Sequence, residues 1–173
     1  MKILGFDVSS TVTAYCCMTV EDKKIINIEH GFFKPNKKGT IFERLSSFQK
    51  EIEKIVQKFN PDQIAIEDII QFMKQKSQAN TIITLALFNR QVGLTCFNSG
   101  YQPYLYNVMQ IRHCIKLNKD LPKKEDVPSV LEKRLNITFP FILNKKSKIK
   151  PESYDVSDAF AVTLTHIIKE KLI

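Results

Sequence analysis

The sequence has few glycines, no long apolar run and no cysteine spacing typical of a zinc site. Only 5 of its 173 residues are glycine, which favours long helices. No apolar stretch reaches the roughly 20 residues that cross a membrane, and the apolar run at the N-terminus is too short for a signal peptide. The four cysteines therefore read as small core residues in a reducing compartment. We expect a cytoplasmic or equivalent location, with a viral or organellar origin left open.

Lysine and arginine outnumber aspartate and glutamate, which gives a formal net charge of +8 at pH 7. Such an excess favours a polyanionic partner. Nucleic acid is favoured over a membrane surface, because no compact basic amphipathic helix stands apart from the rest of the chain. A merely lysine-rich composition would explain the charge equally well. The length suits one domain over residues 1–173, and no internal repeat or low-complexity linker marks a second.

The spacing of apolar residues changes along the chain from the period of a strand to that of a helix and predicts an α/β protein. Three strands open the chain, and the first is apolar throughout, so it should be central in its sheet. Further elements are predicted as strands at 63–67 and 104–106 and as helices at 41–59, 78–97, 127–135 and 155–172. The order βββαβαβαα predicts a central mixed five-stranded sheet flanked by helices. The helix over 78–97 is apolar on more than one side, so either the core or a subunit interface must cover its second face.

Four carboxylates occupy positions that suit a metal-dependent nuclease. Asp7 and Glu67 each end an apolar strand, whereas Asp155 and Asp158 open the last helix. A strand end places a side chain at the edge of a sheet, and residues three apart on a helix share a face. If the two strands are neighbours and the helix crosses their ends, four oxygen donors converge on a small volume, which requires cations to fill it.

Two Mg²⁺ ions roughly 4 Å apart can activate a water on one side of phosphorus and stabilise the leaving oxygen on the other. In this interpretation Asp7 bridges both ions, Glu67 binds one, and Asp158 with Asp155 binds the other. Each acid also has a simpler explanation: Asp155 as a helix N-cap, Asp158 as a first-turn charge, Glu67 as the start of a solvated loop and Asp7 as a turn residue. Together these explanations would require three segments to place acid at one end of the fold by accident.

The segments around the acids form a series of motifs in a fixed order. Residues 3–15 read Ile-Leu-Gly-Phe-Asp-Val-Ser-Ser-Thr-Val-Thr-Ala-Tyr, and residues 64–67 read Ile-Ala-Ile-Glu. A basic segment spans 106–127, and residues 155–166 form an Asp-x-x-Asp-Ala helix that ends in Thr-His. Over nearly the whole chain this series resembles the RuvC-type Holliday junction resolvases of the ribonuclease H-like superfamily.

The resemblance implies a ribonuclease H-like fold, a homodimer, and paired incision of four-way DNA junctions that depends on Mg²⁺, with Mn²⁺ able to substitute. It assigns catalysis and metal binding to the four acids, and it implies a branch-migration helicase as a possible partner. Family roles for basic side chains near the scissile phosphate carry over to Arg112, where the family has lysine, and to Lys124. Either could instead be a solvated surface charge.

The family also wedges an aromatic residue into the junction shortly after its second acid, and here Ile70 or Phe72 occupies that stretch. Phe72 could equally belong to the core. The remaining residues expected to contact DNA are Lys74, Lys76, Lys116, Lys119 and Lys123. Lysines near an acidic site could instead only offset its charge.

The chain departs from the family pattern at two places. The usual Pro-Gly after the first acid is Val8-Ser9, and residues 116–123 replace a glycine-containing loop. The sequence preference of cleavage is therefore not implied, and a broader branched-DNA, flap or RNA-directed nuclease of the same fold is the alternative.

A different class, the actin-like nucleotide-binding ATPases, also has Asp followed by small residues after a glycine-containing strand. The chain is too short for two such halves and lacks a second glycine-rich phosphate loop.

Overall fold

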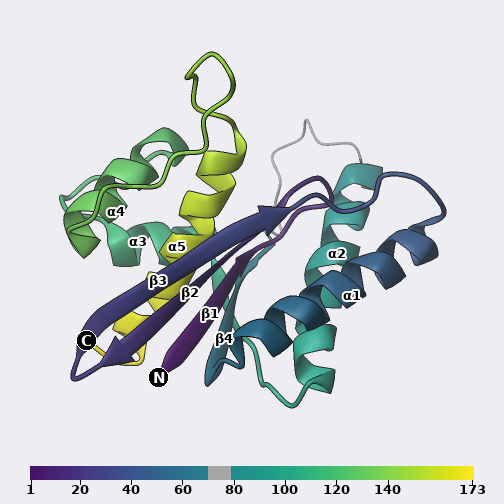
Figure 1. Ribbon diagram of the computed structural model, residues 1–173, viewed down its shortest axis with the longest axis horizontal. Coiled ribbons are helices and arrows are strands. Elements are labelled where there is room, and N and C mark those ends of the chain that lie inside the picture. Colours follow the sequence, from purple (N-terminus) through teal and green to yellow (C-terminus); the bar gives the residue numbers. More distant parts are fainter. Residues whose placement is uncertain (70–78) are drawn as a thin grey trace.

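A mixed five-stranded sheet forms the centre of the protein (Figure 1). The computed structural model describes residues 1–69 and 79–173. Within them the strands are β1 (Lys2–Asp7), β2 (Thr13–Glu21), β3 (Lys24–Phe33), β4 (Gln63–Asp68) and β5 (Tyr104–Asn107). Their order is β3-β2-β1-β4-β5, so β1 is central, as its continuous apolar sequence predicts. β1 runs antiparallel to β2 and parallel to β4.

Helices cover both faces of the sheet (Figure 1). On one face lie α1 (Ile41–Phe59) and α2 (Ala79–Asn98), and on the other lie α3 (Val108–Ile115), α4 (Val127–Leu135) and α5 (Glu152–Lys169). A 3₁₀ turn at Lys124–Asp126 precedes α4. In the described part of the chain, no helix has the length and apolar character needed to cross a membrane.

Neighbouring residues of β2 belong to opposite cores, as the alternation of a strand requires. Cys16 packs in the core beneath α5, and Cys17 packs in the core beneath α1. The described cysteines are free thiols, and three of the four are buried. The three buried cysteines fill small spaces in the core, as the sequence predicts.

Two expectations about helices were wrong. Residues 108–115 were expected only as part of a basic segment, yet they form α3, because Asn107 and Gln110 build a reciprocal capping box with bonds of 2.9 and 3.0 Å. The last helix begins at Glu152, with Pro151 at its N-cap, so Asp155 lies a turn inside the helix. The N-cap explanation for Asp155 therefore fails.

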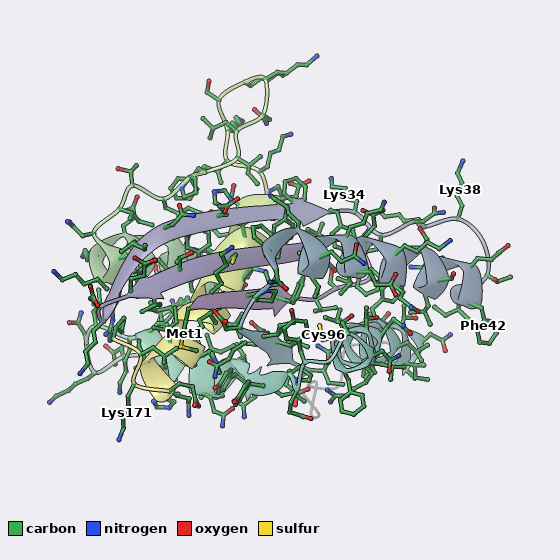
Figure 2. The ribbon with its side chains drawn as sticks, turned by 60° about the horizontal axis from the view of Figure 1, so that its bottom comes forward. Met1, Lys34, Lys38, Phe42, Cys96 and Lys171 are labelled. Carbon is green, nitrogen blue, oxygen red and sulfur yellow. The ribbon has the colours of Figure 1, made fainter. Side chains whose placement is uncertain are left out.

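A close contact at Gly5 fixes how α5 crosses β1. A β-carbon at this position would collide with the Thr163 hydroxyl and backbone. The Thr163 hydroxyl donates to the carbonyl of Ala159 at 2.7 Å and lies 3.2 Å from that of Cys16. In Figure 2, Met1 and Lys171 lie toward one end of the molecule. Asp7 at the C-terminal end of β1 and the two aspartates in the first turns of α5 line one pocket.

Candidate active site

Five acidic side chains from three segments line one pocket, and four of them are the acids predicted from the sequence. Asp7, Glu67, Asp155 and Asp158 surround a cavity of about 460 Å³. Ligand sites in proteins commonly have volumes of about 300–1,000 Å³. The convergence expected from the strand ends and the helix face is present in the fold.

The register of β1 and β4 explains why the first two acids meet. Asp7 is the last residue of β1, and Glu67 is the last but one of β4. The parallel pairing of these strands ends at Phe6 and Ile66, so the two acids follow side by side at the same edge of the sheet. Glu67 is still held on its other side by pairing with Tyr106 of β5. It is therefore part of the sheet and does not begin a solvated loop.

The third segment is α5, whose first turns pass this edge. Asp155 and Asp158 lie three residues apart and both line the pocket, as residues on one helical face should. Asp158 is only 6% exposed, whereas Asp155 is half-buried. The close contact between Gly5 and Thr163 lets the helix approach the sheet near enough for this arrangement.

Burial and mutual repulsion make the acids hard to ionise together. Burial, followed by the charges of Glu67, Asp158 and Asp155, raises the pKa of Asp7 well above its usual range. Burial and the charge of Asp158 raise the pKa of Glu67 to about 7. Burial also raises the pKa of Asp158, although neighbouring cations oppose this shift. Such a cluster attracts positive charge strongly.

Two basic side chains supply part of that charge. Arg112 donates from Nη2 to Asp158 Oδ1 at 2.7 Å. Lys124 Nζ lies 3.0 Å from Asp155 Oδ1 and 3.4 Å from Asp158 Oδ2. Burial alone would lower the pKa of Lys124, but the charges of Asp158 and Asp155 outweigh it and raise that pKa. Arg112 is 8% exposed, and its Nη1 has no hydrogen-bond partner among the residues that the structure describes.

The donor set fits a hard divalent cation. Carboxylate oxygens are the ligands that Mg²⁺ and Mn²⁺ prefer, and those of Asp7 and Glu67 gain most from a cation because their pKa values are raised. Within residues 1–69 and 79–173, no three acidic, histidine or cysteine side chains lie close enough to form a ready-made ion site. Two of the acids are instead bonded to cationic side chains, Asp158 to Arg112 and both Asp155 and Asp158 to Lys124.

The other predicted DNA contacts lie outside the pocket or outside the described residues. Lys119 and Lys123 are exposed and Lys116 is half-buried, and all three belong to the chain between α3 and α4. None of the three lines the pocket. Four further predicted residues fall in the stretch that the structure does not describe, namely Lys74, Lys76, Ile70 and Phe72.

The turn after Asp7 is built by Ser9 where the resolvase pattern has Pro-Gly. The Ser9 hydroxyl accepts from the backbone N–H of Val12 at 3.0 Å and of Thr11 at 3.2 Å, and it donates to the carbonyl of Val12 at 2.6 Å. This local hydrogen bonding holds a tight turn without glycine. Val8 and Ser9 also line the pocket, so the altered turn is part of the site.

Sequence reasoning missed Asn89, which lies beside Glu67. It is 2% exposed, lines the pocket, and donates from Nδ2 to the backbone carbonyl of Glu67 at 2.8 Å. An amide in the largely apolar buried stripe of this helix was the available signal, because a buried polar group needs a partner. The identity of that partner depended on how α2 packs.

The sheet order and the acids at adjoining strand ends define a protein of the ribonuclease H-like fold, with a site suited to metal-assisted phosphodiester hydrolysis. Residues 3–166 match the sequence model of the family described as "Crossover junction endodeoxyribonuclease RuvC". The chain belongs to this family of Holliday junction resolvases. Membership of this family identifies the chain as a nuclease and excludes the actin-like ATPase alternative.

Individual relatives agree with this result along the whole chain. The RuvC of Finegoldia magna is 28% identical over 171 residues, which cover 99% of this chain and 95% of that protein. The structure of Thermus thermophilus RuvC superposes with a TM-score of 0.70 at 21% identity and covers 99% of this chain and 96% of its own. The same enzyme in complex with a Holliday junction substrate gives a TM-score of 0.70 at 20% identity, with the same coverage. The structural likenesses show the fold.

Proposed function

We propose that this chain resolves four-way DNA junctions by hydrolysing phosphodiester bonds with two Mg²⁺ ions held by Asp7, Glu67, Asp155 and Asp158. The observation that carries the proposal is the convergence of these carboxylates, from three separate segments, on one pocket of a RuvC-family chain. When bound, the ions supply Lewis-acid stabilisation of the attacking and leaving oxygens. Mn²⁺ should substitute, because it accepts the same oxygen ligands.

The protein's own residues bind and orient the DNA. Arg112 holds Asp158 through one nitrogen and has a second, Nη1, with no partner among the described residues, so it can donate to a phosphate oxygen. Lys124 keeps its positive charge at neutral pH because the acids raise its pKa. Both cations can therefore exchange carboxylate contacts for phosphate contacts when substrate and ions arrive.

Further contacts to the DNA backbone are proposed for the exposed basic residues near the site. Lys116, Lys119 and Lys123 precede the segment that carries Lys124, so a duplex that reaches the pocket would pass them. The roles of Lys74 and Lys76 as phosphate contacts, and of Ile70 or Phe72 as the junction wedge, rest on the resemblance to the resolvases.

A homodimer is proposed from the surface of α2. Four large apolar side chains form an exposed stripe along this helix, namely Ile83, Leu87, Leu94 and Phe97. An apolar stripe of this kind favours contact with another protein surface, and a second copy placed about a two-fold axis would bury both stripes. Two copies would bring two acid clusters, which paired incision requires. Mass measurement in solution tests the dimer, and a monomer at micromolar concentration would contradict it.

Two further expectations complete the proposal. A branch-migration helicase is a possible partner, since resolution acts on a mobile junction. The cytoplasm or an equivalent reducing compartment is the proposed location, which suits the free thiols of the core.

A cleavage assay tests the proposal directly. The wild-type protein and Asp7→Asn are compared on a synthetic four-way junction with and without Mg²⁺. We expect symmetric paired nicks from the wild type only with Mg²⁺, and no nicks from D7N, because this change removes a ligand charge while leaving the side-chain shape. Junction binding should persist in both proteins without metal and weaken steeply with salt. Cleavage by D7N at the wild-type rate would remove the proposed mechanism.

A competition binding assay separates junction resolution from a broader activity. The loop over 116–123 differs from the resolvase pattern and directly precedes Lys124, which lines the pocket. Competition among junction DNA, duplex DNA, flap DNA and structured RNA measures the preference. Preferred binding of the junction supports resolution, and equal binding of all four supports the broader nuclease.

A further inference from the structure

The end of β4 is held by a side chain of α2. Asn89 donates from Nδ2 to the backbone carbonyl of Glu67 at 2.8 Å. The pairing between β1 and β4 has already ended one residue earlier, at Phe6 and Ile66. Beyond the end of this pairing, the carbonyl of Glu67 is therefore held by a side chain.

Arg90, the next residue of α2, extends this support. Its Nη1 donates to Asn89 Oδ1 at 3.1 Å, and its Nη2 lies 2.8 Å from Asp68 Oδ1. The same oxygen of Asp68 accepts the backbone N–H of Ile69 at 2.9 Å. Two adjacent residues of one helix thus hold two adjacent residues at the end of one strand.

These contacts leave Asn89 little capacity to bind a substrate. Its amide nitrogen is bonded to Glu67 and its amide oxygen to Arg90, and the side chain is almost fully buried. Arg90 pairs with Asp68, which lines the same pocket but is not one of the four proposed metal ligands. Asn89 therefore acts on the site through the backbone of Glu67, and Arg90 acts through the side chains of Asn89 and Asp68.

We infer that Asn89 and Arg90 are positioning residues that fix the backbone at Glu67 and so set the affinity of the acid cluster for divalent ions. The inference rests on the proposed function, since it takes Glu67 as a metal ligand. A ligand carboxylate must be held in place to within a fraction of an ångström, and the loss of an outer partner commonly weakens metal binding by roughly 10–100-fold.

The test is a Mn²⁺ titration of the DNA-free protein, followed by electron paramagnetic resonance of the unbound ion. Asn89→Leu keeps the volume of the side chain and removes the donor. We expect it to weaken Mn²⁺ binding by about tenfold or more, with recovery in Asn89→Gln, which restores an amide donor. The lost hydrogen bond lowers the melting temperature, so Mn²⁺ binding is measured well below the melting temperature of each variant. Metal-free junction binding should stay near that of the wild type, which separates positioning from a general structural effect.

Thr95→Val is the matched control. Thr95 is a buried polar residue of the same helix, and its hydroxyl donates to the backbone carbonyl of Gln91 at 2.7 Å. This variant should leave Mn²⁺ affinity unchanged. Arg90→Met tests the same support from its exposed end and carries the test if N89L does not fold. Removing a positive charge near the acids would by itself tighten cation binding, so weaker binding by R90M can only come from lost positioning.

The outcomes separate the inference from the proposed function. If the wild type binds Mn²⁺ and cleaves the junction, but N89L or R90M binds Mn²⁺ as tightly as the wild type, the inference is wrong and the proposed function stands. If the wild type binds no divalent ion, both are wrong. Weaker binding by both variants, with T95V unchanged, supports the inference.

Discussion

Replacing Arg112 with methionine is expected to destabilise the fold when divalent ions are absent. The bond between Arg112 Nη2 and Asp158 Oδ1 is 2.7 Å long, and the two side chains are only 9% and 8% exposed. Removing one partner of such a buried pair costs about 3–5 kcal/mol, because the other charge is left uncompensated. Two features reduce the cost here. Lys124 Nζ lies 3.4 Å from Asp158 Oδ2, and Asp158 can take up a proton because burial raises its pKa.

We therefore expect Arg112→Met to lower the free energy of unfolding by about 2–3 kcal/mol. At about 2–4 °C per kcal/mol for a chain of this size, the melting temperature would fall by roughly 4–12 °C. Urea unfolding and thermal melting at pH 7 with a chelator measure both quantities. Added Mg²⁺ should restore part of the loss, since a cation bound only by the folded protein stabilises it.

A double variant provides the control for this prediction. Arg112→Met combined with Asp158→Leu removes both charges and should lie nearer the wild type in stability than R112M alone, because no uncompensated charge is left in the core. The reasoning would be refuted by a loss below about 1 kcal/mol in R112M, or by a double variant that is less stable than R112M.

Two other predictions concern the packing of α5 and the response to acid. Gly5→Ala should cost about 1–3 kcal/mol, because the new methyl group meets the hydroxyl and backbone of Thr163. Gly93→Ala is the control, because a β-carbon there meets nothing within 4 Å, and it should be neutral or stabilising. Equal losses of unfolding free energy in the two variants, measured by urea unfolding, would contradict the packing argument. Both ring nitrogens of buried His166 are hydrogen-bonded, and burial lowers its pKa. The unfolded chain therefore takes up a proton first, so stability is full above about pH 6.5 and falls as pH drops below that value. Unfolding measured from pH 8 to 5 should show a smaller fall in His166→Gln, and an identical fall would exclude this histidine as a cause.

Most secondary structure could be predicted because it depends on local patterns. The helix at Ile41–Phe59 has the bounds predicted from apolar spacing, with Thr40 and Glu43 as a capping box. α3 was missed although most of its eight residues are apolar, because the helix is short and lies within a segment interpreted from its basic residues. The start of α5 was placed too late, since Asp155 resembles an N-cap and nothing local distinguishes it from a residue one turn inside the helix.

The acids could be predicted as a group for the same local reason, as each lies at the end of a strand or in the first two turns of a helix. Their partners could not. The pairing of Arg112 with Asp158 joins residues 46 apart in sequence, and the bond from Asn89 to Glu67 joins residues 22 apart. Such contacts depend on the angle and depth at which a helix packs, which apolar periodicity does not encode.

The sequence by itself determined the order of the strands and of every described helix except α3, the central place of β1 and the three segments that carry the acids, because apolar periodicity and chain connectivity constrain these features. Only the tertiary structure decided how the acids are neutralised and supported. Close packing at Gly5 brings α5 against the sheet, and the packing of α2 on the sheet places Asn89 within hydrogen-bonding distance of Glu67. Hydrogen bonds and ion pairs act over about 3 Å, so their partners follow from three-dimensional packing and not from sequence spacing.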